Sequence, residues 1–147
     1  MAGDDGKGDI DPLDERLEVS VDTHDKLDEV FRMQEAFMHV LQKRDGTDVM
    51  PAWPVDLTKK SSQQLCKSLA FDSMGELFEA VQHLKNSKPH RKTEIKEFDR
   101  ESFKEELIDA FKYFLELLIF AGVTPTEFFE AYVKKDAVIH KRVTGGY

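Results

Sequence analysis

The stretch RESFKEELIDAFKYFLELLIFA, from Arg100 to Ala121, gives the strongest indication of the fold. Its first half carries apolar residues at three- and four-residue steps, which is the spacing of one helix face. From Tyr113 onward the stretch is apolar nearly all round, with Glu116 as the exception. Because a helix that is apolar on every side is usually buried, we expect this helix at the centre of the fold. Its expected buried stripe consists of Phe103, Leu107, Phe114 and Leu118.

Three further helices are predicted around this central one. The first runs from about Thr23 to Lys43, and the second runs from about Ser61 to Lys85. The last begins with a capping box at Thr124 and Glu127, just after a helix stop at Gly122. The second helix is expected to bury its large apolar residues, which are Leu69, Met74, Leu77, Phe78, Val81 and Leu84.

These elements predict an all-α protein. No segment alternates between apolar and polar residues with the two-residue period of a strand, so a bundle of four to five helices is expected. The Gly- and Asp-rich start predicts a disordered segment over residues 1–21, and the helical domain is then residues 22–147.

The composition narrows the class of partner and the location. The chain has 147 residues and a formal net charge of −8, which is unsuited to a nucleic-acid duplex or an anionic membrane surface. The longest apolar run is too short to cross a bilayer. The single cysteine, Cys66, cannot form an internal disulfide, and we expect a small helix residue there rather than a nucleophile. With no recognisable signal peptide, this predicts a cytoplasmic protein, in the host cytoplasm if the protein is viral.

Two pairs of acidic residues carry the candidate chemistry. Glu76 and Glu79 stand three residues apart on the second helix, and Glu106 and Asp109 do so on the central helix. Each spacing places both carboxylates on one side of a helix. Antiparallel packing would bring all four together, where like charges oppose ionisation and a divalent cation removes the conflict. Oxygen ligands favour Mg²⁺ or Mn²⁺, whereas a di-iron site would need a Glu-x-x-His motif that these helices lack.

Other residues offer contacts to a nucleotide. Basic residues follow the second helix and lie on the last one, either as solvated cations or as contacts for a triphosphate: Lys88, His90, Arg91, Lys92, Lys134, Lys135 and Arg142. Trp53 lies between two prolines and is either a packing residue or a wall for a planar ligand. Gln34 falls inside the apolar stripe of the first helix, where it either bonds to a neighbouring helix or faces a ligand.

The acidic pattern resembles that of a known superfamily. Glu76-x-x-Glu79 followed by Glu106-x-x-Asp109 resembles the ExxE…ExxD signature of the all-α nucleoside triphosphate pyrophosphatases, which include MazG-like proteins and the dimeric dUTPases. LDEVFRMQ is similar to the first helix of the dUTPase branch, and ELIDAFKYFLELLIFAGVTPTEFFEAY to its acidic central helix and the next one. YVKKDAVIHKRVTGGY resembles its closing motif, so the likeness spans about Lys26 to Tyr147.

The resemblance implies Mg²⁺-dependent cleavage of a deoxynucleoside triphosphate (dNTP) between its α and β phosphates, as part of nucleotide-pool control. It implies that all four acids bind the metal and that Glu79, with Glu76, activates the water. Phosphate contacts are implied for Lys88, Arg91, Lys135, Arg142 and Tyr147. It also implies a MazG- or dimeric dUTPase-like bundle that is completed by self-association, as a homodimer or a homotetramer.

For the base, the resemblance implies contacts from Gln34 and from the closing motif. Asp136 and His140 stand where the dUTPases have two asparagines, and Trp53 is the candidate wall. The resemblance implies dUTP as the substrate. Because Asp136 can accept hydrogen bonds from an amino group or a ring N–H, a purine dNTP such as dGTP is also expected, and cytosine stays open. The alternative function is a non-catalytic helical module that senses a nucleotide or binds a protein.

Overall fold

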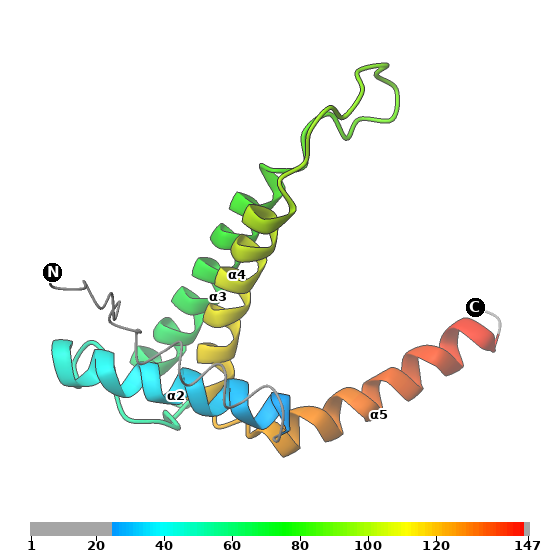
Figure 1. Cartoon of the computed structure of the whole chain (residues 1–147). Coiled ribbons are helices and arrows are strands. Elements are labelled where there is room, and N and C mark those ends of the chain that lie inside the picture. Colours follow the sequence, from blue (N-terminus) through cyan, green and yellow to red (C-terminus); the bar gives the residue numbers. More distant parts are fainter. Residues whose placement is uncertain (1–24, 146–147) are drawn as a thin grey trace, which may run out of the picture.

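The structure is a computed structural model that describes residues 25–145. Within this range the chain forms four helices and no strand: α2 (Lys26–Asp45), α3 (Lys60–Val81), α4 (Arg100–Phe120) and α5 (Pro125–Thr144). The predicted all-α class is therefore confirmed. The disorder predicted for residues 1–21 lies outside the described residues. In Figure 1, α3 and α4 form a long antiparallel hairpin that rises from α2, while α5 diverges from the hairpin.

The connection between α4 and α5 follows from local sequence. Gly122 adopts φ 79°, a backbone conformation that favours glycine, and the Val123 amide donates to the Leu118 carbonyl at 2.9 Å. Two residues later, the Thr124 hydroxyl accepts a hydrogen bond from the Glu127 amide and begins α5. This hydrogen bond confirms the predicted N-cap at Thr124, which is one of the two bonds of a capping box.

The core lies where α2 crosses the base of the hairpin. Its buried apolar residues are Phe31, Met38, Met50, Leu69, Leu115, Ile119 and Phe120. The last three come from α4, which confirms the prediction that this helix is the central one. The loop between α2 and α3 is tied to the end of α4, because the Val55 amide donates to the Phe120 carbonyl at 2.8 Å.

The hairpin itself packs on small residues. Ala80 and Ala110 are buried, and Ser73 Oγ on α3 donates to the Ala110 carbonyl on α4 at 2.7 Å. The prediction that α3 buries its large apolar stripe is wrong beyond Leu69. The remaining residues of that stripe are 44–64% exposed: Met74, Leu77, Phe78, Val81 and Leu84. Small side chains allow two helices to approach closely, so the small and acidic side of α3 faces α4.

Two other sequence expectations change in detail. On α4, the predicted stripe residues Leu107 and Phe114 are exposed. The helix α3 ends at Val81, before the expected Lys85, because the amides of His83 and Leu84 bond to carbonyls only three residues back.

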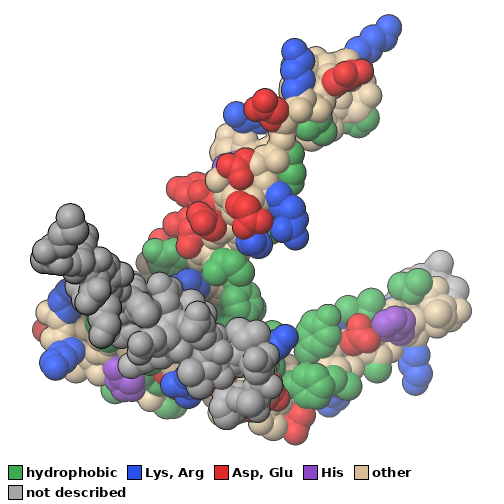
Figure 2. All heavy atoms as spheres, in the orientation of Figure 1, with side chains coloured by type: hydrophobic (Ala, Val, Ile, Leu, Met, Phe, Trp, Pro, Cys, Tyr) green, Lys and Arg blue, Asp and Glu red, His purple; other side chains and the backbone are tan. Residues whose placement is uncertain are grey.

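The helix α5 has little support from its own chain. It has no buried residue, and its main contact with the core is Phe128, whose ring centroid lies 6.2 Å from that of Phe31. Figure 2 shows hydrophobic side chains along α5 and on the hairpin. None of the helices within residues 25–145 combines the length and the apolar character that a bilayer crossing requires.

Candidate functional site

Three carboxylates meet where α3 and α4 run side by side. Glu76 and Glu79 come from α3 and Glu106 comes from α4, and one oxygen of each lies within 4.8 Å of the others. We call these three residues the acidic cluster. The convergence predicted from the spacing is present for them, and Figure 2 shows acidic side chains gathered over the hairpin. Asp109, on the next turn of α4, lies close enough to influence Glu76 and Glu106 electrostatically.

Desolvation and the neighbouring acids raise the pKa of two members of the acidic cluster, Glu76 and Glu106. Desolvation at the helix interface raises the pKa of Glu76, and the neighbouring acids, Glu79 first, raise it further. Desolvation also raises the pKa of Glu106, with Glu79 and Asp109 adding to the effect and His83 opposing it. A nearby cation would favour the ionised forms. Hard carboxylate oxygens at this spacing fit a divalent ion such as Mg²⁺ or Mn²⁺.

A cavity of about 670 Å³ adjoins the acidic cluster, between α2, α3 and α4. Glu76 belongs to both, and Asp109 also lines the cavity. Apolar and aromatic walls come mainly from Phe37, Leu41, Met50, Leu65, Leu69 and Tyr113, and charged groups come from Asp72, Lys112 and Glu116. Small-molecule sites commonly have volumes of roughly 300–1,000 Å³, so the cavity has the size of a ligand site.

Gln34 is buried beside this cavity and bonds to a neighbouring helix. It is 3% exposed, and its Oε1 accepts a hydrogen bond from Lys112 Nζ of α4 at 3.1 Å. The same ammonium group lies 5.0 Å from the centroid of the Phe37 ring, within the range of a cation–π interaction. One of the two readings left open for Gln34, a bond to a neighbouring helix, is thus observed.

Several polar residues of this cavity are not among the site residues predicted from the sequence. Glu116 is only 8% exposed, and burial raises its pKa, with Asp72 adding to this effect and Lys112 opposing it. The pKa of Tyr113 is raised by desolvation and then by the surrounding acids. A signal existed in the sequence, because Asp109, Lys112 and Glu116 recur at three- and four-residue steps on the helix predicted to be most buried.

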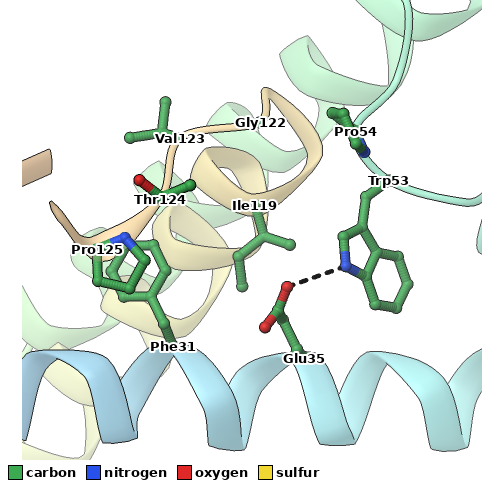
Figure 3. Close-up of a pocket in the computed structure, with 9 residues that line it drawn as sticks. All are labelled: Phe31, Glu35, Trp53, Pro54, Ile119, Gly122, Val123, Thr124 and Pro125. Atoms are coloured by element: carbon green, nitrogen blue, oxygen red, sulfur yellow. Dashed lines mark hydrogen bonds between the residues drawn. The ribbon is translucent and has the colours of Figure 1, made fainter. Parts of the chain in front are cut away.

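Trp53 lines a second cavity, of about 540 Å³, which shares no lining residue with the first (Figure 3). Its Nε1 donates to Glu35 Oε1 at 3.1 Å, and its ring meets Phe120 edge-on with centroids 6.1 Å apart. These contacts show that Trp53 packs against α2 and α4 while it also forms part of the wall of this second cavity. The structure does not bring it to the cavity beside the acidic cluster.

The predicted phosphate contacts are not gathered at the acidic cluster within one chain. Lys88 and Arg91 are exposed in the connection 82–99, which extends past the end of the hairpin (Figure 1). Lys135 and Arg142 are exposed on α5, which diverges from the hairpin. Tyr147 lies outside the described residues.

The two candidate base contacts on α5 pair with each other. His140 Nδ1 lies 3.2 Å from Asp136 Oδ2 and 3.0 Å from the Asp136 carbonyl oxygen. Both residues are exposed, and within one chain they lie on the helix that leaves the hairpin.

Comparisons of the chain with protein-family models, with curated proteins and with solved structures gave no match. The acidic cluster and the cavity that adjoins it are therefore the features of the chain that point to a function.

Proposed function

We propose that the protein is a Mg²⁺-dependent dNTP pyrophosphohydrolase, which releases a nucleoside monophosphate and pyrophosphate and acts in nucleotide-pool control. The observation that supports this most is the meeting of Glu76, Glu79 and Glu106 beside a cavity large enough for a nucleoside. The acidic spacing, which resembles that of the all-α pyrophosphatases, supports the same reaction class.

In this proposal the four acids share one task, and Glu79 has a second. Glu76, Glu79, Glu106 and Asp109 hold Mg²⁺ or Mn²⁺. A bound divalent ion supplies polarisation of the phosphate and a lower pKa for a water molecule. Glu79 is the most exposed member of the acidic cluster, and it accepts the proton of the attacking water. The water oxygen joins the α-phosphorus as the bond to the bridging oxygen breaks and pyrophosphate leaves.

The working unit in this proposal is a homodimer or a homotetramer. Large apolar side chains on the outer sides of α3 and α4 and along α5 are exposed, among them Phe71, Phe78, Ile108, Phe129 and Tyr132. Apolar surface of this extent commonly marks an interface. Because α5 diverges from its own hairpin, Lys135, Arg142 and Tyr147 reach the triphosphate of a neighbouring copy, and Asp136 and His140 approach its base by the same route.

The direct test is a substrate panel. Each common deoxy- and ribonucleoside triphosphate is incubated with Mg²⁺, and the products are separated by chromatography. We expect at least one dNTP to yield monophosphate and pyrophosphate, with turnover abolished by a chelator. Glu79→Gln should lower kcat by roughly 100-fold or more, because a proton acceptor is lost, while the helical circular dichroism stays unchanged.

Glu105→Gln is the matched control. Glu105 precedes Glu106 on α4 but is exposed and outside the acidic cluster, so this variant should keep the wild-type rate. If the folded wild-type protein turns over no nucleotide, the enzymatic proposal is wrong and the non-catalytic module becomes the better reading.

A further inference from the structure

The cavity beside the acidic cluster contains a carboxylate, Glu116, that is not engaged in a side-chain hydrogen bond. Glu116 lines the cavity and is 8% exposed, yet it forms no hydrogen bond or ion pair with any residue in the range 25–145. The neighbouring cation, Lys112, donates to Gln34 instead. Within residues 25–145 no fully buried side-chain oxygen lacks a hydrogen-bond partner, so the unbonded Glu116 carboxylate keeps some exposure in the cavity. A ligand that brings a donor into the cavity can therefore bond to it and gain binding free energy there.

We propose that this cavity holds the nucleotide base and that Glu116 accepts a hydrogen bond from an exocyclic amino group, which selects cytosine, adenine or guanine over uracil and thymine. The inference rests on the proposed function for the class of ligand.

The polarity of the cavity matches a nucleotide along its length. Glu76 and Asp109 join the lining to the acidic cluster, where the phosphates and the divalent ion would lie. The remaining walls are largely apolar and include the aromatic rings of Phe37 and Tyr113. Flat bases bind well between such walls, while a few polar groups fix their identity.

Glu116 is the acceptor that remains for this purpose. The oxygen of Gln34 already accepts from Lys112. Asp72 also lines the cavity but is exposed, so water can satisfy its carboxylate. No other residue in the described part of the cavity lining is both acidic and buried.

The edges of the bases explain the selectivity. Adenine, cytosine and guanine each carry an amino group on the edge used for pairing, whereas uracil and thymine carry two carbonyl oxygens that flank one N–H group. A carboxylate oxygen accepts a hydrogen bond from an amino group. Opposite a carbonyl oxygen, two desolvated acceptors would face each other without a proton between them, which disfavours binding.

The test compares bases that differ at this edge. Non-hydrolysable α,β-imido analogues of dCTP and dUTP, and of dATP, dGTP and dITP, are titrated into the full-length protein with Mg²⁺ by calorimetry. The matched pairs are dCTP with dUTP, and dATP or dGTP with dITP. In the pair that binds most tightly, the analogue with the amino group should bind roughly 10- to 100-fold more tightly than the one without it. Equal or tighter binding of the carbonyl base, or no binding of any analogue, overturns the inference.

Glu116→Gln tests the residue itself. The amide has nearly the same shape but offers both a donor and an acceptor, so the ratio of the two affinities should fall to within about threefold. Glu105→Gln, on the exposed side of the same helix, should leave the ratio unchanged. An unchanged ratio in Glu116→Gln would remove Glu116 from base recognition.

Failure of the inference can be separated from failure of the proposed function. Amino-selective binding that depends on Glu116, combined with no hydrolysis of any nucleotide, would leave the base site standing and remove the pyrophosphohydrolase activity. Hydrolysis of dUTP at least as fast as that of every amino-bearing dNTP would leave the pyrophosphohydrolase activity standing and remove the proposed selectivity for amino-bearing bases.

Discussion

Glu116 is a costly residue to place near the C-terminal end of α4. The sequence marks it as one acid within the run YFLELLIFA, and the structure buries it to 8% exposure. Burial disfavours the charged form of a carboxyl group, and the effect on its pKa is also an effect on stability. A residue that weakens the free protein in this way is a candidate for a functional contact.

The stability cost of Glu116 should depend on pH. Because burial raises its pKa, with Asp72 adding and Lys112 opposing, the folded state binds the Glu116 proton more tightly than the unfolded state does. The contribution of protonated Glu116 to the free energy of unfolding is therefore fully present only below the ordinary pKa of 4.5. This contribution is lost as the pH rises through the raised pKa of the folded state. We expect Glu116→Gln to melt a few degrees higher than the wild type near neutral pH and the two melting temperatures to converge near pH 4.

Thermal melts in a series of buffers between about pH 4 and pH 7.5 measure this difference. The comparison with Glu105→Gln, an exposed carboxyl group on the same helix, corrects for the general effect of removing one negative charge. A gap between Glu116→Gln and the wild type that stays constant across the series would contradict the assigned cause.

At the scale of the elements, helix ends and the meeting of the acids could be read from the sequence. Thr124 and Gly122 have unambiguous roles in capping, and a three-residue spacing on two antiparallel helices is enough to bring carboxylates together. The packing face of α3 could not be read in this way. Periodicity locates an apolar face, but it does not say which partner covers that face.

The same limit explains which parts of the site were missed. The hairpin is joined through Ser73, Ala80 and Ala110, and such small residues contribute little to a hydropathy pattern. The contact of Lys112 with Gln34 joins residues far apart in sequence, and no local rule predicts it. Spacing therefore predicted the acidic cluster, whereas the cavity beside it depends on how α2 crosses the hairpin.

The close approach of α3 and α4 gives a prediction at this scale. Ala110 is 6% exposed, and its carbonyl receives the bond from Ser73. Ala110→Leu inserts a larger side chain into that contact, and overpacking of this kind costs about 1–3 kcal/mol. Because the helices must move apart, we also expect weaker binding of Mn²⁺. Urea denaturation measures the first effect, and calorimetric titration of Mn²⁺ measures the second.

Ala131→Leu is the matched control for this change. Ala131 is exposed on α5, so the same substitution there should alter stability by less than about 0.5 kcal/mol. If Ala110→Leu were as stable as the control, α3 and α4 would not be held together by small residues.

At the scale of the whole molecule, the chain leaves much apolar surface uncovered. The outer side of α3 and most of α5 present large hydrophobic residues, including Phe71, Phe78, Phe129, Tyr132 and Val143. Within residues 25–145, the covered parts of the hairpin are its small and acidic side and its base, where α2 crosses. Burial of apolar surface is the main favourable term in association, so contact between the outer faces of two copies would explain why the predicted stripe of α3 is exposed here.

Phe78→Asp tests this at the outer side of α3, where Phe78 is 64% exposed. In an isolated chain the change is nearly neutral, within about 0.5 kcal/mol, but in an oligomer it buries a carboxylate without a partner. Light scattering should give two or four times 16.9 kDa for the wild type and 16.9 kDa for the variant. Ile95→Asp, at 63% exposure in the connection 82–99, should remain assembled.

Because the contacts from α5 are proposed to come from a neighbouring copy, dissociation of the Phe78→Asp variant should also raise KM for the triphosphate. A wild-type protein that stays at 16.9 kDa at every concentration would show that the exposed stripe of α3 does not mediate self-association.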